Sequence, residues 1–413
     1  MSACFSDARR YSRVVFLKES TDVVNRIARS DVGQTVLGID ASNIREGGGV
    51  THLTQLISAA DPAKYQIFRV TIWGGKRLLS KLPERAWLQK VYVPSLDKSL
   101  PWRIFWQQLI LPGVLRRAGC NVLFSPGGSV PTRMSIPSVT MSQNLLPFEK
   151  NERRRFGVIS WMNVKLKLVG ILQSKSFRRA NGVIFLSRYA EKLINSIVKI
   201  RRTALIPHGV EARFSCAVRE MQSPEYYSMG KPFRLLYVSI IAGYKHQLSV
   251  AKAVAVCRSK GLPIEIDFVG PAYKAAHSDL IEEIERLDKN RQFIHYRGAI
   301  AFEELHKAYA QADAFVFASS CENLPNILFE AMSAGLPILC SNRGPMPEVL
   351  GDAGLYFDPE NVESITDAIT KIFQEPVLRE KFAAMGKQRV RNYSWERCAD
   401  ETFCFIEKVA SGQ

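Results

Sequence analysis

The feature that most constrains the fold is a regular alternation of short apolar runs with helical segments along most of the 413-residue chain. Runs such as TVLGID at 35–40 and FRLLYVSII at 233–241 are rich in β-branched and other apolar residues, which predicts buried parallel strands. Strands that alternate with helices form βαβ units and a parallel sheet. Because two such series occur, the sequence predicts an α/β protein of two doubly wound, Rossmann-like domains that face a central cleft.

The two expected series are separated by a polar stretch at 210–232, which contains Pro and Gly, shows no hydrophobic period and is interpreted as a linker. The expected strands lie at 35–40, 65–73, 90–94, 120–126, 135–143, 181–187 and 203–209, and then at 233–241, 263–271, 292–300, 314–320, 336–342 and 354–359. The expected division is an N-terminal extension (1–34), an N-terminal domain (35–209), the linker, a C-terminal domain (233–392) and a last helix (393–413) that packs back on the N-terminal domain.

The composition is that of a globular protein, with 46% hydrophobic, 10% aromatic and 23% charged residues, which excludes wholesale disorder. No apolar run reaches the roughly 18 residues of a membrane-spanning helix, and the N-terminus is too charged for a secretory signal, so we expect a cytoplasmic protein. The eight cysteines form no Cys-x-x-Cys pair, and they are expected to be small buried residues in a reducing compartment.

Positive charge is concentrated in the first half of the chain. Residues 1–210 hold 33 Lys and Arg against 12 Asp and Glu, whereas residues 211–413 hold 23 against 27, and the net charge is +17. Such a surface suits a polyanionic partner, either a nucleic acid or the anionic leaflet of a membrane. A solvated basic face that only aids solubility is the alternative.

The strongest candidate site lies in SSCENLPNILFEAMSAGLPI at 319–338. A strand is expected to end at Ser320 and a helix to begin near Pro325, with Glu322 in the loop and Glu330 inside the helix. A helix N-terminus offers unpaired N–H groups and a partial positive charge to a diphosphate, and carboxylates accept hydrogen bonds from sugar hydroxyls. Alternatively, both carboxylates merely interact favourably with the helix dipole.

This Glu-x7-Glu pattern and the following AMSAGLPILCSNRGPMPEVLGDAGLYFDPEN resemble the donor-site signature of retaining glycosyltransferases of family 4. The resemblance covers about 36–410 and includes LGIDASNIREGGGVTHL, FLSRYAEKLI, IPHGV, FVGP and RGAI in order. It implies the two-domain GT-B fold and a retaining hexosyltransferase that takes a nucleotide-sugar donor and needs no divalent metal and no other cofactor.

The resemblance also implies roles for individual residues. Glu330 is expected to bind the ribose hydroxyls of the donor, and Glu322 the hydroxyls of its sugar. Lys245 corresponds to the lysine that neutralises the diphosphate leaving group, and a cation after a strand end is chemically suited to that task. The glycines Gly47, Gly48 and Gly49 correspond to the loop where the backbone approaches phosphate or acceptor.

Some positions depart from the family pattern near the diphosphate. Ile240 stands where many members have an Arg, so Arg297 is a candidate for the missing phosphate contact. Pro325 lies in the loop that is usually Gly-rich and has no N–H to donate, so Asn323 or Asn326 is expected to compensate.

Another departure concerns the proton of the acceptor. Gln143 and Asn144 replace the His of many members; neither is a base at neutral pH, and both are expected to position a sugar by hydrogen bonds. No protein base is needed if the leaving diphosphate takes that proton. No Asp-x-Asp pair follows a strand in a way that suggests a metal-bound diphosphate.

The stretch at 152–181 predicts a contact with membranes. Its middle, 158–172, is apolar except for Lys165 and Lys167, and basic residues flank both ends. This pattern suits a helix at an anionic interface, with Trp161 at the level of the headgroups, although a core helix with a basic outer face is the alternative. We therefore expect a peripheral protein on the inner face of the cytoplasmic membrane that acts on a lipid-linked or growing glycan, as in bacterial lipopolysaccharide and surface polysaccharide synthesis.

Two other functions are weighed. A GT-B sugar-nucleotide epimerase would convert a nucleotide sugar without an acceptor. A nucleic-acid binder is suggested by charge alone, and because no helix-turn-helix, RNP-like or zinc-finger pattern accompanies the charge, no nucleic-acid partner is expected. UDP- and GDP-linked donors, the acceptor and the linkage stay open.

Overall fold

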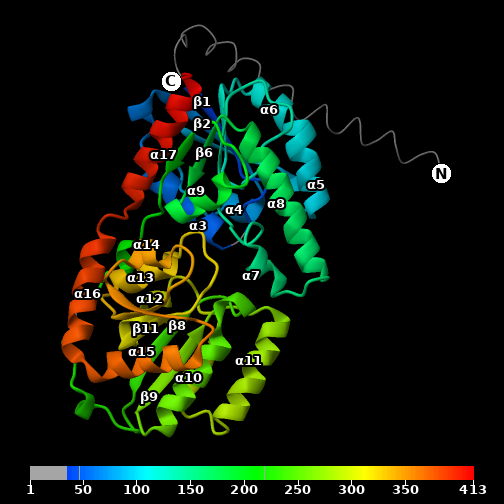
Figure 1. The fold of residues 1–413 in the computed structure, drawn as a ribbon. Helices are drawn as coiled ribbons and strands as arrows, with labels where there is room; N and C mark the ends of the chain where they lie inside the picture. Colours follow the sequence, from blue (N-terminus) through cyan, green and yellow to red (C-terminus); the bar gives the residue numbers. More distant parts are fainter. Residues whose placement is uncertain (1–34, 46, 218) are drawn as a thin grey trace.

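The structure is a computed structural model that describes residues 35–45, 47–217 and 219–413, so the expected extension at 1–34 lies outside the described residues. These residues form two parallel α/β units, one above the other in Figure 1. The prediction of two parallel sheets is confirmed.

The N-terminal sheet has seven parallel strands in the order β3-β2-β1-β4-β5-β6-β7. Its strands are β1 (Thr35–Asp40), β2 (Ile67–Gly74), β3 (Leu88–Tyr92), β4 (Val122–Ser125), β5 (Ser138–Met141), β6 (Gly182–Phe185) and β7 (Thr203–Leu205). The chain direction across the sheet reverses after β1, and the crevice at such a switch point is where open α/β sheets bind ligands.

The C-terminal sheet has six parallel strands in the order β10-β9-β8-β11-β12-β13. Its strands are β8 (Phe233–Val238), β9 (Ile264–Val269), β10 (Ile294–Gly298), β11 (Ala314–Phe317), β12 (Ile338–Ser341) and β13 (Gly354–Phe357). The switch point here lies between β8 and β11. Lys245 and Glu322, the residues expected to bind the diphosphate and the sugar of the donor, follow these two strands.

Helices cover both sheets. In the N-terminal unit they are α3 (Gly48–Ala59), α4 (Lys76–Leu79), α5 (Leu100–Phe105), the π-helical turn η3 (Trp106–Ile110), α6 (Leu111–Arg117), α7 (Lys150–Arg154), α8 (Trp161–Arg179) and α9 (Arg188–Asn195). In the C-terminal half they are α10 (Gln247–Ser259), α11 (Lys274–Leu287), α12 (Leu305–Gln311), α13 (Asn326–Ser333), α14 (Met346–Leu350), α15 (Val362–Gln374), α16 (Pro376–Val390) and α17 (Trp395–Ala410). Within the described ranges, no helix combines the length and apolarity needed to cross a bilayer.

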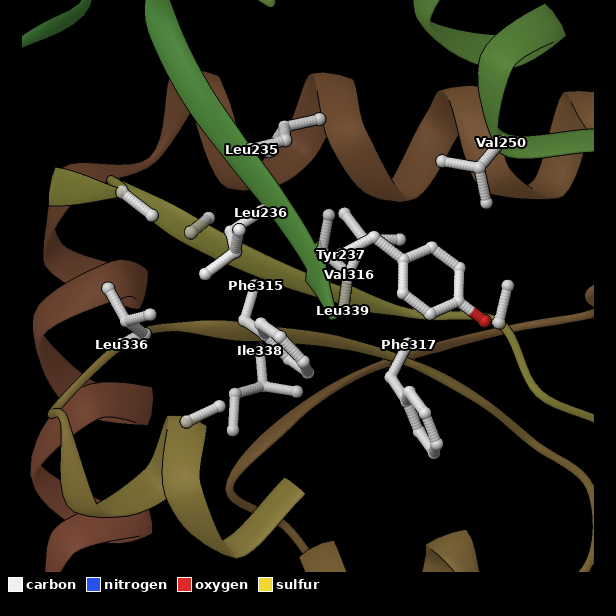
Figure 2. Close-up of a cluster of buried hydrophobic side chains, with 14 of the residues drawn as sticks. Leu235, Leu236, Tyr237, Val250, Phe315, Val316, Phe317, Leu336, Ile338 and Leu339 are labelled. Atoms are coloured by element: carbon white, nitrogen blue, oxygen red, sulfur yellow. The ribbon is translucent and has the colours of Figure 1, made fainter. Parts of the chain in front are cut away.

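The core of the C-terminal unit explains why its strands read as apolar runs. Figure 2 shows Leu236 and Tyr237 of β8 beside Phe315 and Phe317 of β11 and Leu339 of β12, and all five side chains are at most 2% exposed. A strand covered by helices on both faces buries successive side chains, so its sequence is apolar without alternation.

The segment interpreted as a linker packs against this core. It contains two short 3₁₀ helices, η4 (Ala212–Phe214) and η5 (Pro224–Tyr226). The ring of Phe214 is buried and meets Tyr309 edge-on, and Tyr227 meets Phe233 in the same way. Aromatic residues spaced too irregularly to show a period therefore fasten this segment to the C-terminal unit.

The last helix, α17, returns to the N-terminal sheet, beside β6 in Figure 1. The contact depends on Gly182 of β6, because a Cβ there would lie 2.8 Å from the ring of Phe405. Phe405, Val409 and Cys398 of α17 are buried in the core of the N-terminal unit.

The chain crosses between the two units twice, and the crossings touch. The N–H of Val210 donates to the carbonyl of Tyr393 (3.2 Å). A Cβ on Gly209 would lie 2.2 Å from the backbone nitrogen of Trp395, so only glycine fits at this point. Gly209 and Trp395 thus form a compact double crossing.

Candidate active site

Lys245 and Glu322 meet at the switch point of the C-terminal sheet. Lys245 ends the 3₁₀ turn η6 (Gly243–Lys245) after β8, and Glu322 lies in the loop after the neighbouring strand β11. The Nζ of Lys245 forms an ion pair with the Glu322 carboxylate, and these side chains are 7% and 16% exposed. The arrangement places a sheltered cation next to a carboxylate that can accept hydrogen bonds from sugar hydroxyls.

The surrounding structure holds Lys245 from several sides. The buried hydroxyl of Tyr237 donates to the carbonyl of Lys245 (2.5 Å). The Nζ also lies 5.5 Å from the centre of the Phe317 ring, a distance at which the face of an aromatic ring attracts a cation. The ammonium is therefore oriented before any ligand arrives.

Glu330 belongs to the same loop–helix unit but has a different partner. It lies within α13 and is buried, and its carboxylate accepts a hydrogen bond from the hydroxyl of Tyr309 on α12 (2.8 Å). Burial raises the pKa of Glu330 to about 7, although the hydrogen bond from Tyr309 opposes the shift. The carboxyl thus points to α12 rather than to the Lys245–Glu322 pair, and its binding of ribose stays a prediction.

The two asparagines expected near the diphosphate both make contacts between the two units. The side-chain N–H of Asn323 donates to the carbonyl of Ser142 after β5 (2.6 Å), and the backbone carbonyl of Asn323 accepts from the hydroxyl of Ser187 after β6 (2.8 Å). Asn326, the first residue of α13, is hydrogen-bonded to His208 (3.1 Å). The side-chain N–H group of Asn323 and the side-chain oxygen of Asn326 are thus engaged without a ligand, and a role of either residue in holding phosphate stays a prediction.

The residues expected on the acceptor side gather at the carboxyl edge of the N-terminal sheet. A Cβ on Gly49 would lie 3.1 Å from the side-chain oxygen of Gln143, so the glycine loop after β1 lies against the end of β5. Gly48 has nothing near its Cβ position, and Gly47 has a φ of +67°. Asn144 is exposed and accepts a hydrogen bond from the N–H of Leu146 (3.0 Å). This edge faces Asn323 through the neighbouring Ser142.

Arg297 lies at the β10 edge of the C-terminal sheet, away from the switch point between β8 and β11, and it has a partner there. It lies on the edge strand β10, half exposed, and its guanidinium donates to Asp267 of β9 (2.7 Å). The structure therefore pairs Arg297 with Asp267 rather than with Lys245 or Glu322, and its role as a phosphate ligand stays a prediction.

A buried group that the sequence analysis missed supports the loop after β1. Asp40, 1% exposed, accepts hydrogen bonds from the N–H of Ser42 (2.9 Å), the hydroxyl of Ser125 (3.0 Å) and the amide of Gln107 (2.5 Å). Gln107 reaches inward from the π-helical turn η3, an irregularity that no sequence period indicates. In the sequence, the only indication of a role for Asp40 was its position at the end of a predicted strand.

A second missed group lies at the double crossing. The rings of His52 on α3 and His208 lie with centroids 4.5 Å apart and planes tilted by 30°, and both rings lie near Trp395. Burial lowers the pKa of His208 to about 4, and burial together with His208 holds the pKa of His52 well below its usual range. Both imidazoles are therefore neutral near pH 7. His208 stands in IPHGV, where only its sequence motif pointed to it.

Among the residues placed by the structure, no group of three or more His, Cys, Asp or Glu side chains is arranged to hold a metal ion. The cation at the candidate site is Lys245. Metal-independent activity stays a prediction, because it concerns turnover rather than the resting arrangement of side chains.

Comparison with known proteins places the candidate donor residues within a family. Residues 218–389, which include Lys245, Glu322 and Glu330, match the family described as "Glycosyl transferases group 1". Over 130 residues the chain is 35% identical to O-antigen chain mannosyltransferase B of Escherichia coli. That match covers 32% of the chain and 34% of the relative, about a third of the length of the curated protein.

Solved structures resemble the chain over most of its length. Sucrose-phosphate synthase from Thermosynechococcus elongatus is 16% identical with a TM-score of 0.72, and the match covers 92% of this chain and all of that one. HepE of Anabaena in complex with UDP is 17% identical with a TM-score of 0.63, covering 89% and 98% of the two chains. At such identities the likeness shows the fold alone, and the predicted GT-B arrangement of two facing α/β units is confirmed.

Proposed function

We propose that this chain, whose residues 218–389 match the group 1 glycosyl transferases, transfers a hexose, with retention of configuration, from a nucleotide sugar to a glycan or lipid-linked acceptor. The observation that carries the proposal is the sheltered Lys245–Glu322 pair at the switch point of the C-terminal sheet. The pair lies where open α/β sheets bind nucleotides and directly before α13.

The proposed chemistry follows from what these groups can do to a diphosphate. When the donor binds, its phosphate replaces Glu322 as the partner of the Lys245 ammonium, and the free N–H groups of α13 add positive potential. Charge grows on the leaving oxygen as the glycosidic bond breaks, and an oriented cation stabilises that charge more than it stabilises the ground state. The released Glu322 carboxylate accepts hydrogen bonds from the donor sugar.

The proposed proton transfer needs no protein base. The acceptor hydroxyl loses its proton to the departing diphosphate oxygen, which leaves on the same face of the sugar. Gln143, whose side-chain oxygen lies beside Gly49, is suited to orient the acceptor by a hydrogen bond. Retention of configuration is the stereochemical outcome of this same-face exchange.

The donor nucleotide is proposed to be UDP or GDP. Its ribose hydroxyls are assigned to Glu330, whose raised pKa, about 7 because of burial, lets the carboxyl accept or donate hydrogen bonds. Support for UDP comes from HepE, a structure of the same fold in complex with UDP. The likeness to an O-antigen mannosyltransferase supports a surface polysaccharide, including lipopolysaccharide, as the product class.

An anionic membrane surface is the proposed location of the acceptor. Fourteen of the 24 exposed large hydrophobic side chains in the described residues fall in two segments, 100–110 and 158–172. Figure 1 shows the corresponding helices α5 and α8 on the same side of the N-terminal sheet. The hydroxyl of Thr132 donates to Gln108 of η3, which directly follows α5, and accepts from Arg179 of α8, so Thr132 joins the two segments.

The charge around these segments suits anionic lipids. No Asp or Glu occurs between residues 98 and 148 or between residues 153 and 190, whereas both stretches carry Lys and Arg. Apolar side chains that enter the interface, together with a basic surround, favour the inner face of the cytoplasmic membrane. We propose peripheral attachment there.

The proposed function is tested by nucleoside diphosphate release. UDP- and GDP-sugars are supplied with and without membrane extracts that contain lipid-linked acceptors, and the product is examined for the anomeric configuration. Lys245→Ala should abolish release stimulated by acceptor, whereas Lys260→Ala, which removes an exposed lysine at the end of α10, should not. Isomerised donor without an acceptor requirement would instead support a sugar-nucleotide epimerase.

A further inference from the structure

Glu152 of α7 reaches across from the N-terminal unit to the loop that precedes Glu322. Its carboxylate accepts a hydrogen bond from the hydroxyl of Ser320, directly after β11, at 2.6 Å. Both residues are 9% exposed. A buried carboxylate of one unit is therefore bonded to the candidate donor site of the other, at the junction where Figure 1 places α7.

The same hydroxyl holds the residue that follows Lys245. Nε2 of His246 lies 2.9 Å from the Ser320 oxygen. A hydroxyl has one hydrogen, and two acceptors lie within reach of it, the Glu152 carboxylate at 2.6 Å and the Tyr244 carbonyl at 3.2 Å. The shorter bond to the carboxylate is the stronger one, so the hydrogen goes to Glu152. The Ser320 oxygen is then free to accept from the N–H of His246. The donors thus run in one direction, from His246 through Ser320 to Glu152.

His246 needs this support because its backbone is in the left-handed region, with φ 53° and ψ 31°. Few residues other than glycine adopt this conformation, and it persists where neighbouring contacts hold it. The turn reverses the chain between Lys245 and α10 and so determines where the lysine side chain begins. The N–H of Ser320 also donates to the carbonyl of Tyr244 (2.9 Å), so one serine holds both neighbours of Lys245.

The charged groups that face Glu152 belong to both units. Arg155 donates to Glu152 (2.7 Å) and to Glu360 of the C-terminal unit (2.6 Å). The guanidinium thus neutralises the buried carboxylate and adds a second link between the units. Charge-assisted hydrogen bonds of this kind are stronger than neutral ones.

We propose that Glu152 is a positioning residue for the transfer reaction: through Ser320 and His246 it holds Lys245 in place when α7 is docked against the C-terminal unit. The inference rests on the proposed function in that Lys245 is taken as the cation for the leaving diphosphate. The inference adds that Lys245 is correctly placed only when α7 is docked against the C-terminal unit. Docking of the two units and alignment of the cation therefore occur together.

The test compares Glu152→Ala and Glu152→Gln with Lys150→Ala, an exposed residue of the same helix. Glu152→Ala should lower kcat at least about tenfold with the donor KM changed less than about twofold, because a misplaced cation affects mainly the transition state. Glu152→Gln should recover most of the rate, because its amide oxygen still accepts from Ser320. Lys150→Ala should match the unaltered protein.

A second measurement does not depend on turnover. Hydrogen exchange of the amides at 243–247 should become at least about tenfold faster in Glu152→Ala and in Ser320→Ala, and the double variant should be no faster than either single one, because both remove the same link. Unchanged exchange and kcat in folded Glu152→Ala would overturn the inference, as would a lowered melting temperature alone. If the unaltered protein transfers no sugar from UDP- or GDP-sugars, the proposed function fails, while the exchange measurement still decides the link.

Discussion

Nδ1 of His208 donates a hydrogen bond to the side-chain oxygen of Asn326, 3.1 Å away, and so ties the first crossing between the two units to the first residue of α13. The opposite nitrogen of the ring, Nε2, is buried and has no hydrogen-bond partner in the structure as described. Protonation of Nε2 would bury a positive charge and an N–H group that has no acceptor within reach among the described residues. The crossing is therefore sensitive to acid.

Stability should fall as the pH drops below about 6.5. Burial lowers the pKa of His208 from 6.5 to about 4. Between these two pH values the unfolded chain binds a proton at this residue, whereas the folded chain does not. The free energy of unfolding should lose about 2 kcal/mol between pH 7.5 and pH 5 from this residue. Urea unfolding at the two pH values measures the loss, and His208→Asn should show a smaller one. An equal loss in the variant would assign the acid sensitivity elsewhere.

Glu330→Gln should separate stability from nucleotide binding. Because burial raises the pKa of Glu330 to about 7, its contribution to stability is present below about pH 4.5 and is lost as the pH rises through 7. The neutral amide still accepts from Tyr309, so the variant should be more stable than the unaltered protein by about 3 kcal/mol at pH 8 and by no more than about 1 kcal/mol at pH 5. Affinity for UDP or GDP, measured by calorimetry, should fall about tenfold. Unweakened binding would remove the ribose assignment.

Gly209→Ala should destabilise the protein by about 2 kcal/mol or more, because the added methyl group would lie 2.2 Å from the backbone of Trp395 and neither crossing can move alone. Thermal unfolding measures the effect. Gly230→Ala is the matched control, since a Cβ there meets nothing within 4 Å, and it should change stability by less than about 0.5 kcal/mol. Equal behaviour of the two variants would contradict the tight crossing.

Membrane attachment should depend on the apolar residues at the start of α8. Replacing both Ile159 and Trp161, which are 93% and 76% exposed, by Ser should lower sedimentation with phosphatidylglycerol-containing vesicles at least about tenfold. Val377→Ser, at an equally exposed position of the C-terminal unit, should not. Binding by the unaltered protein should weaken in 0.5 M salt, because counterions screen the basic surface. Attachment that survives both the double substitution and high salt would exclude this surface.

Chelation should leave turnover intact. Lys245 supplies the positive charge for the leaving diphosphate in the proposed mechanism, so transfer in 5 mM EDTA should proceed at the rate measured without it. Added Mg²⁺ or Mn²⁺ should give no increase beyond about twofold. Loss of activity in EDTA that either ion restores would show that the lysine does not suffice.

The sheets were predictable because parallel strands covered on both faces leave continuous apolar runs in the sequence. TVLGID and FRLLYVSII became β1 and β8, the first strand of each sheet. The ends of elements were less predictable, because they depend on contacts made elsewhere. The expected strand at 203–209 stops at Leu205, beyond which the chain turns into the crossing that packs on Trp395.

The candidate site was predictable only where its residues are close in sequence to a strand end. Lys245 and Glu322 follow adjacent strands, so their meeting follows from the topology. Glu152, by contrast, stands 168 residues from Ser320, and nothing local indicates that a helix of one unit docks on the loop of the other. The partners of Asn323 and Arg297 were hidden for the same reason, since a hydrogen bond leaves no period in the sequence.

The return of α17 to the N-terminal sheet affects how the chain can be made. Phe405 and Val409 of α17 pack on Gly182, more than two hundred residues earlier, and the three atoms nearest to a Cβ at that position all belong to these two side chains. During synthesis on the ribosome, the N-terminal sheet therefore exposes an apolar patch until α17 has been made and can pack on it. Protection of nascent chains by chaperones should peak in that interval and end with the final dozen or so residues.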